Sequence, residues 1–275
     1  MRPSSLALTL IFVAPLPILA GETPWQEVGP GVSVRLISAG PPSADGKAFA
    51  ALEISMPENT KTYWRVPGQA GLPTELDFSG STGIVGHTQH WPYPVRHEQD
   101  GVLDYVYFGD TVLPIELQVE GSDPAIALDV TMGICSEICV PAQARFDLPL
   151  TDAAPDRANG LRVRQAMAEV PLEWDENAPP IGAVVVAPAG DAIAVEVDPE
   201  LINVQSLIAS TVSGLPLFGA PQKSPNPDLV LLPVLAKGDG QPLEALDVSL
   251  TFMTEQGAFE VHRVVGETIA ARSED

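Results

Sequence analysis

Two cysteines, Cys135 and Cys139, are the residues whose type and spacing point most directly to chemistry. They are the only cysteines of the chain, and three residues separate them in the stretch GICSEICVPA (133–142). Two thiols at this spacing can form a disulfide, which either holds a fold together or is opened and closed while the protein works. The residues around the pair indicate which of these two roles is favoured.

The residues on either side of the pair predict two antiparallel strands. From Ile126 to Ile134 every second residue is apolar, so these positions share one face, and the other face, which includes Cys135, is expected to avoid the core. Apolar alternation resumes in ARFDLPL (144–150). If the three residues between the cysteines form a hairpin loop, the two cysteines lie directly opposite each other, with Cα atoms about 4.5 to 5.5 Å apart, which suits a disulfide.

A disulfide at this position would stabilise the fold only weakly. In the chain-entropy model, closing a loop of about 5 residues contributes roughly 2 kcal/mol, against about 4.7 kcal/mol for a loop of about 100 residues. The bond would also join two strands that are already neighbours, in a chain long enough to bury a stable core without cross-links. These points favour a redox-active bond over a structural one, and both roles stay open.

Reactivity would need a stabilised thiolate, and the loop itself does not supply one. No lysine, arginine or histidine lies between the cysteines, and Glu137 would oppose the charged form. The nearest cation in sequence is Arg145. We therefore expect activation to come from another part of the fold.

Metal binding is the other chemistry to weigh for these residue types. A copper site that uses a cysteine, two histidines and a methionine usually has a histidine and the methionine soon after the cysteine, and the strand after Cys139 contains neither. A zinc site needs about four ligands, and His87 and His90 with two thiolates are only a numerical match. His97 and His262 have no motif around them. We expect no bound metal and no cofactor.

The first twenty residues have the pattern of a secretory signal peptide. MRPSSLALTLIFVAPLPILA has an arginine at position 2, an apolar run and Ala20 before the expected cleavage point. Two prolines and a short apolar core argue against the alternative of a retained anchor helix, which needs about 20 apolar residues. The next apolar stretch, LVLLPVLA (229–236), is predicted to be a buried strand. We expect an exported protein without stable membrane insertion, in a compartment where thiols can be oxidised.

The charge balance of the chain is strongly acidic. It has 36 Asp and Glu against 14 Lys and Arg, a formal net charge of −22, and no basic run. Nucleic acid and anionic lipid surfaces are therefore poor partners. The excess negative charge is typical of a soluble exported protein, and attraction of a basic partner is the alternative.

Short alternating runs such as VSVRLIS (32–38) dominate the chain and predict an all-β protein. They fill the region up to Leu150, and alternation returns in GAVVVAPAGDAIAVEVD (182–198). Between these regions, apolar residues from Val163 to Val170 have helical spacing, and an acidic, proline-bounded stretch follows. The expected organisation is a signal peptide (1–20), a first β-sandwich (21–150), a helix and linker (151–178) and a second, smaller β-sandwich (179–275).

Four ordered blocks of sequence resemble a known family of exported redox domains. They are TYWRVPGQAGLPTELDFSGS (62–81), WPYPVR (91–96), YFGDTVLPIEL (107–117) and CSEICVPAQARFDLPL (135–150). Together they are similar to the periplasmic amino-terminal domain of the thiol:disulfide interchange protein DsbD, and most similar to the branch that includes the suppressor of copper sensitivity ScsB. The resemblance covers about residues 25–150, and the helix and second β domain are similar in layout to the exported part of that branch.

The resemblance implies two immunoglobulin-like antiparallel sandwiches, a periplasmic location and thiol–disulfide exchange without a cofactor. Cys135 and Cys139 would be the catalytic pair, and Cys139, which precedes Val-Pro, would form the mixed disulfide with the partner. Tyr63, Trp64 and Phe78 are candidates for an aromatic shield or a partner contact, unless they belong to the sandwich core.

The resemblance also implies partners and leaves other functions open. The implied partners are a membrane-embedded thiol reductant, which a separate protein would supply, and periplasmic thioredoxin-like proteins. The alternatives are a non-catalytic binding or assembly module and a copper-tolerance accessory, each with a structural disulfide.

Overall fold

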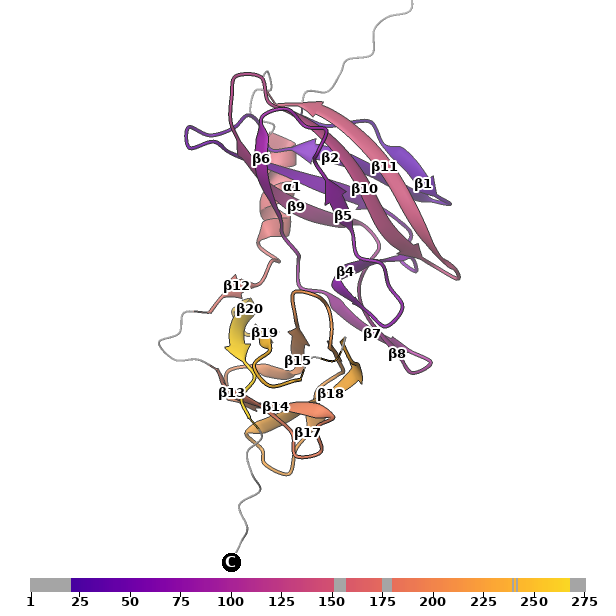
Figure 1. Ribbon diagram of the computed structural model, residues 1–275. Helices are drawn as coiled ribbons and strands as arrows, with labels where there is room; N and C mark the ends of the chain where they lie inside the picture. The colour runs from indigo at the N-terminus through magenta and orange to yellow at the C-terminus, as the bar shows by residue number, and fades with distance from the viewer. Residues whose placement is uncertain (1–20, 151–156, 175–179, 239, 241, 268–275) are drawn as a thin grey trace, which may run out of the picture.

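The computed structural model describes residues 21–150, 157–174, 180–238, 240 and 242–267. Within these ranges the chain forms two β-sandwiches, one beyond the other, with the helix α1 (Arg157–Met167) beside the first (Figure 1). The predicted all-β, immunoglobulin-like class is confirmed. The predicted signal peptide lies outside the described residues. No helix in the described ranges is long and apolar enough to cross a membrane.

Two sheets form the first sandwich. One contains, in spatial order, β1 (Gln26–Gly29), β2 (Val32–Ser38), β3 (Lys47–Ser55), β9 (Thr111–Val119) and β6 (Ile84–Gln89). The other contains β11 (Cys139–Pro149), β10 (Ala125–Cys135), β4 (Lys61–Gly68), β8 (Val102–Phe108) and β7 (Val95–Gln99), with β5 (Glu75–Asp77) beside β10. Because side chains alternate along each strand, the apolar residues at every second position enter the core between the sheets.

Two further sheets form the second sandwich. One contains β12 (Leu172–Glu173), β20 (Gly257–Val264), β19 (Asp247–Thr254) and β15 (Asn203–Ser210). The other contains β13 (Ile181–Val186), β14 (Ala192–Val197), β18 (Leu229–Ala236) and β16 (Leu217–Phe218), with β17 (Gln222–Lys223) beside β18. A separate apolar core lies between them.

The expected linker contributes to the second sandwich at its start. Leu172 and Glu173 pair in parallel with Phe259 and Glu260 of β20, and Trp174 packs against the second core. The ring of Trp174 meets the ring of Phe259 edge to face at 4.9 Å between centroids. Partial burial of this aromatic ring against the second core stabilises a short strand in a stretch whose acidic composition suggested a loop.

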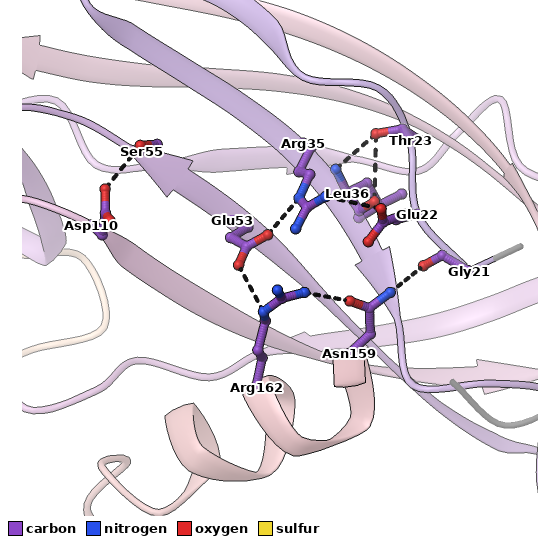
Figure 2. A network of polar contacts seen from close by, with 10 residues as sticks. All are labelled: Gly21, Glu22, Thr23, Arg35, Leu36, Glu53, Ser55, Asp110, Asn159 and Arg162. Atoms are coloured by element: carbon purple, nitrogen blue, oxygen red, sulfur yellow. Dashed lines mark hydrogen bonds and ion pairs between the residues drawn. The ribbon is translucent and has the colours of Figure 1, made fainter. Parts of the chain in front are cut away.

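A polar network fastens α1 to the first sandwich (Figure 2). Arg35 on β2 pairs with Glu53 on β3 at 2.5 Å and with Glu22 at 3.1 Å. From the helix, Arg162 pairs with the same Glu53 at 3.5 Å and donates a hydrogen bond to Asn159 at 2.8 Å. The helix therefore packs as part of the first sandwich, and the chain leaves for the second sandwich only after it.

Direct contacts join the two sandwiches. Arg65 on β4 forms an ion pair with Glu260 on β20. Arg96 on β7 donates hydrogen bonds to the main-chain oxygens of Gln205 and Leu207, both at 2.6 Å. Burial raises the pKa of Glu260, but the charge of Arg65 and hydrogen bonds from Arg65 and Thr251 outweigh it, so the net shift is downward.

Candidate functional site

The two cysteines close the long hairpin of β10 and β11. The strands pair without a break from Ala125 opposite Pro149 to Cys135 opposite Cys139, which leaves three residues for the loop. The cysteines form a disulfide with Cα atoms 4.0 Å apart. The tip lies at one edge of the first sandwich (Figure 1). The register predicted from the alternation on both sides of the pair is confirmed.

The two sulfurs lie in different environments. Cys135 is 6% exposed and packs with Tyr63, Val106 and Phe108 in a small apolar cluster on the outer face of the sheet. Cys139 is exposed. As predicted, Cys135 lies outside the core between the sheets. It is nevertheless buried, because residues of the neighbouring strands β4 and β8 form a separate apolar cluster around it. An incoming thiol or disulfide therefore meets Cys139 first.

Tyr63 contacts the disulfide through its hydroxyl group. Its phenolic oxygen lies 3.4 Å from Cys139 Sγ, and the residue is 1% exposed. Neither sulfur of a disulfide carries a hydrogen, so the hydroxyl must be the donor. Burial, and then the negative charge of Asp104, raises the pKa of Tyr63. The phenol therefore keeps its proton at neutral pH and can donate it in a hydrogen bond to sulfur.

Two glycines allow the Tyr63 ring to lie where it does. A Cβ on Gly133 would lie 2.9 Å from Tyr63 Cδ2 and 2.8 Å from the main-chain oxygen of Leu72. A Cβ on Gly71 would overlap the opposite edge of the same ring. Only glycine permits so close an approach, so the ring is held from both sides.

The segment 68–74 covers this ring and is itself tied to the sheet. The N–H of Gln69 donates to the main-chain oxygen of Leu103 on β8 at 2.9 Å. The N–H of Gly133 on β10 donates to the main-chain oxygen of Leu72 at 3.1 Å. The segment therefore bridges the outer face of β8 and β10 and encloses Tyr63 beside the disulfide.

A buried ion pair lies next to the pair of cysteines. Lys61 on β4 is opposite Cys135, and its Nζ is 2.9 Å from Asp104 Oδ2 and 5.8 Å from the centre of the Tyr63 ring. Lys61 is thus a cation from another part of the fold that lies beside the cysteines, and Asp104 offsets its charge. Arg145, the nearest cation in sequence, pairs instead with Asp129 at the surface.

The other predicted aromatics lie elsewhere. Trp64 is fully buried in the core between the sheets, edge-on to Tyr105 at 5.8 Å between ring centres. Phe78 is also buried in this core, and its ring lies 4.6 Å from that of His87 on the opposite sheet. Of the three candidates for a shield, the structure brings only Tyr63 to the cysteines. Among the described residues, no three His, Cys, Asp or Glu side chains gather as metal ligands would.

The family of the first sandwich follows from a comparison of sequences. A family model described as the N-terminal domain of the thiol:disulfide interchange protein DsbD matches residues 35–151. These residues belong to that domain family. The match includes Tyr63, Cys135 and Cys139, so the whole contact between phenol and disulfide lies inside the DsbD N-terminal domain.

The fold of one solved structure is similar to this chain over more residues than the family model matches. The chain is similar to the crystal structure of the N-terminal periplasmic domain of ScsB from Proteus mirabilis, with a TM-score of 0.71 and 22% identity. The alignment covers 90% of this chain and 99% of that chain, so it includes the helix and the second sandwich. Comparison with curated proteins gave no match.

Several groups at the site of this DsbD N-terminal domain were not singled out from the sequence. They are Lys61, Asp104 and the two glycines at the Tyr63 ring. Tyr63 was proposed only as one of three aromatics. The sequence does contain a signal that distinguishes Tyr63 from Trp64, because the two residues are adjacent in β4 and must point to opposite faces of the sheet. Once Trp64 is assigned to the core, Tyr63 faces the side that carries Cys135.

Proposed function

We propose that this chain performs thiol–disulfide exchange in the periplasm through Cys135 and Cys139. In this proposal a membrane-embedded thiol reductant reduces the pair, and periplasmic thioredoxin-like proteins receive the reducing equivalents. The observation that carries the proposal is the unequal pair itself: Cys139 is an exposed residue whose sulfur accepts a hydrogen bond from a buried phenol, and Cys135 is buried beside it.

The exchange takes two steps. The thiolate of Cys139 attacks a sulfur of the partner disulfide, which forms a mixed disulfide and releases one partner thiolate. The thiolate of Cys135 then attacks the Cys139 sulfur, which closes the Cys135–Cys139 bond and releases the second partner thiolate. The two thiol protons of the pair end on the two partner thiolates. In sum the partner disulfide gains two electrons and the Cys135–Cys139 dithiol loses them.

Burial and hydrogen bonding assign different tasks to the two cysteines. Attack needs access and a stabilised thiolate; Cys139 is an exposed residue and has the Tyr63 hydroxyl as a donor to its sulfur. Cys135 needs only to reach Cys139, which it faces across the hairpin. Its burial in the apolar cluster keeps the Cys135 thiol from reacting with other disulfides before the mixed disulfide at Cys139 has formed.

The position of the bond argues against a structural role. It closes a loop of three intervening residues between strands that pair over their whole length. A loop of about 5 residues contributes roughly 2 kcal/mol in the chain-entropy model, which is small beside the burial of two complete cores. A bond whose loss costs the fold so little can be opened during function.

Two single-cysteine variants test the proposal. Cys135→Ser keeps the exposed sulfur, and Cys139→Ser, the matched control, keeps the buried one. Each is mixed with a thioredoxin that retains only its exposed cysteine, loaded with thionitrobenzoate (TNB). We expect Cys135→Ser to release TNB at least tenfold faster and to form the covalent complex on a non-reducing gel. Equal rates, or no complex with either variant, would contradict the proposal.

A further inference from the structure

One edge of the hairpin remains uncovered beside the exposed sulfur. β11 is the last strand of its sheet, with β10 on one side. On the other side β1 reaches it at Arg145, whose main-chain oxygen accepts a hydrogen bond from Gln26 Nε2 at 2.6 Å. From Cys139 to Gln143, no described residue pairs with this outer edge. An unpaired strand edge is a template for a further strand.

The hydrogen bonds of Gly133 show which backbone groups of β11 face outward. The N–H of Gly133 bonds to Leu72 and its oxygen accepts from Thr62, so both groups point away from β11. Gly133 is opposite Pro141, which makes this a pair without mutual hydrogen bonds. Such pairs alternate along an antiparallel ladder.

The alternation therefore defines a set of free groups along the edge. Cys135 with Cys139, and Thr131 with Gln143, are also pairs without mutual hydrogen bonds. Cys139 and Gln143 thus present both N–H and C=O to the outside, and Pro141 presents its C=O. Proline has no N–H, and at this outward-facing position its presence removes no hydrogen bond between β10 and β11.

Exposed apolar side chains mark the same edge. Ile138 is 74% exposed and Val140 is 43% exposed, on either side of Cys139. The hairpin tip therefore combines free backbone groups, apolar side chains and an accessible sulfur within a few residues. These are the features of a site that binds an extended peptide by strand addition.

We propose that the outer edge of β11, from Cys139 to Gln143, binds an extended, cysteine-containing segment of a substrate protein as an added strand. The proposal rests on the exchange function above and adds a second substrate class, extended cysteine-containing segments, to the thioredoxin-like proteins, whose reactive cysteine lies at the start of a helix. The partner cysteine lies directly opposite Cys139 in a hydrogen-bonded pair. Cα atoms in such pairs are about 5.5 Å apart, within the range of about 4.4 to 6.8 Å for a disulfide. The mixed disulfide then forms without rearrangement of either backbone.

The test compares two substitutions at one position in the Cys135→Ser background. Gln143→Pro removes the outward N–H and leaves the bonds between β10 and β11 in place. Gln143→Ala removes the same side chain and keeps the N–H. The probe is a nine-residue, β-prone peptide whose central cysteine carries TNB, so that a strand centred on Cys139 extends as far as Gln143. Each rate constant is divided by that of the same variant with free dithiobis(nitrobenzoate), which has no peptide backbone.

We expect the normalised rate with the peptide to be about tenfold lower for Gln143→Pro than for Gln143→Ala. A peptide N-methylated on the residue two before its cysteine lacks the N–H that would face the Pro141 oxygen. With the Cys135→Ser protein that keeps Gln143, its normalised rate should be about tenfold lower than that of the unmethylated peptide, which tests the edge without altering the protein. Equal rates for the two variants, together with equal rates for the two peptides, would overturn strand addition and leave the exchange function standing. If Cys139 reacts with neither the peptide nor the free reagent, the exchange function fails as well.

Discussion

Replacing Tyr63 with phenylalanine removes one hydroxyl from the site and leaves the ring between its two glycines. In the reduced protein this hydroxyl is positioned to donate to the Cys139 thiolate, because it lies 3.4 Å from the sulfur and is buried. A hydrogen bond to a charged group contributes about 1.5 to 3 kcal/mol, and each pKa unit corresponds to about 1.36 kcal/mol. We therefore expect Tyr63→Phe to raise the pKa of the Cys139 thiol by about 1 to 2 units.

The effect on rate is smaller than the effect on pKa. At a pH below both pKa values the thiolate fraction falls about 10- to 100-fold, while the higher basicity raises the nucleophilicity of each thiolate by about 3- to 10-fold. The net result for Tyr63→Phe is an exchange rate about 3- to 10-fold lower at pH 7.

The assay follows thiolate absorbance at 240 nm against pH in the Cys135→Ser background, so that only Cys139 titrates. Tyr107→Phe is the matched control, because its hydroxyl is also buried but bonds to the main-chain oxygen of Pro92. We expect no shift in the Cys139 titration for the control. A Cys139 pKa in Tyr63→Phe within about 0.3 units of the parent would refute the reasoning and leave Tyr63 a packing residue.

Three further predictions concern packing, charge and the disulfide. Gly133→Ala should lower the free energy of unfolding by about 1 to 3 kcal/mol in urea titrations, because its Cβ would lie 2.9 Å from the Tyr63 ring; a neutral result would contradict the close packing. Glu260→Gln should remove part of the acid sensitivity of unfolding. The folded-state pKa of Glu260 is lowered from 4.5, so its contribution is complete above pH 4.5 and is lost as the pH falls through the folded value; an unaltered pH profile would contradict the contribution of the Arg65 ion pair. Replacing both cysteines with serine should cost about 2 kcal/mol, and a loss above about 4 kcal/mol would indicate a structural bond.

The strands and the cysteine register were predictable because they depend on local patterns. Alternation in VSVRLIS gave the bounds of β2 as the structure has them. Alternation before and after the cysteines placed Cys135 opposite Cys139. A period of two identifies a face of a strand wherever one side is buried, and a short loop leaves little freedom of register.

The contacts that make the site chemically specific were not predictable in the same way. Tyr63 and Cys139 are far apart in sequence, and so are Lys61 and Asp104. Such contacts depend on how β4 and β8 lie beside β10, which no local pattern records. The burial of Cys135 has the same origin, because it arises from strands and a covering segment that approach from elsewhere in the chain.

The reduction potential of the Cys135–Cys139 bond tests the central claim most directly. The protein is equilibrated with thiol–disulfide buffers of known potential, and the reduced fraction is read by alkylation and mass spectrometry. We predict a potential above about −300 mV, where exported redox proteins exchange electrons, because the bond is exposed at Cys139 and adds little to the stability of the fold. A potential well below about −300 mV would show a structural disulfide and contradict exchange.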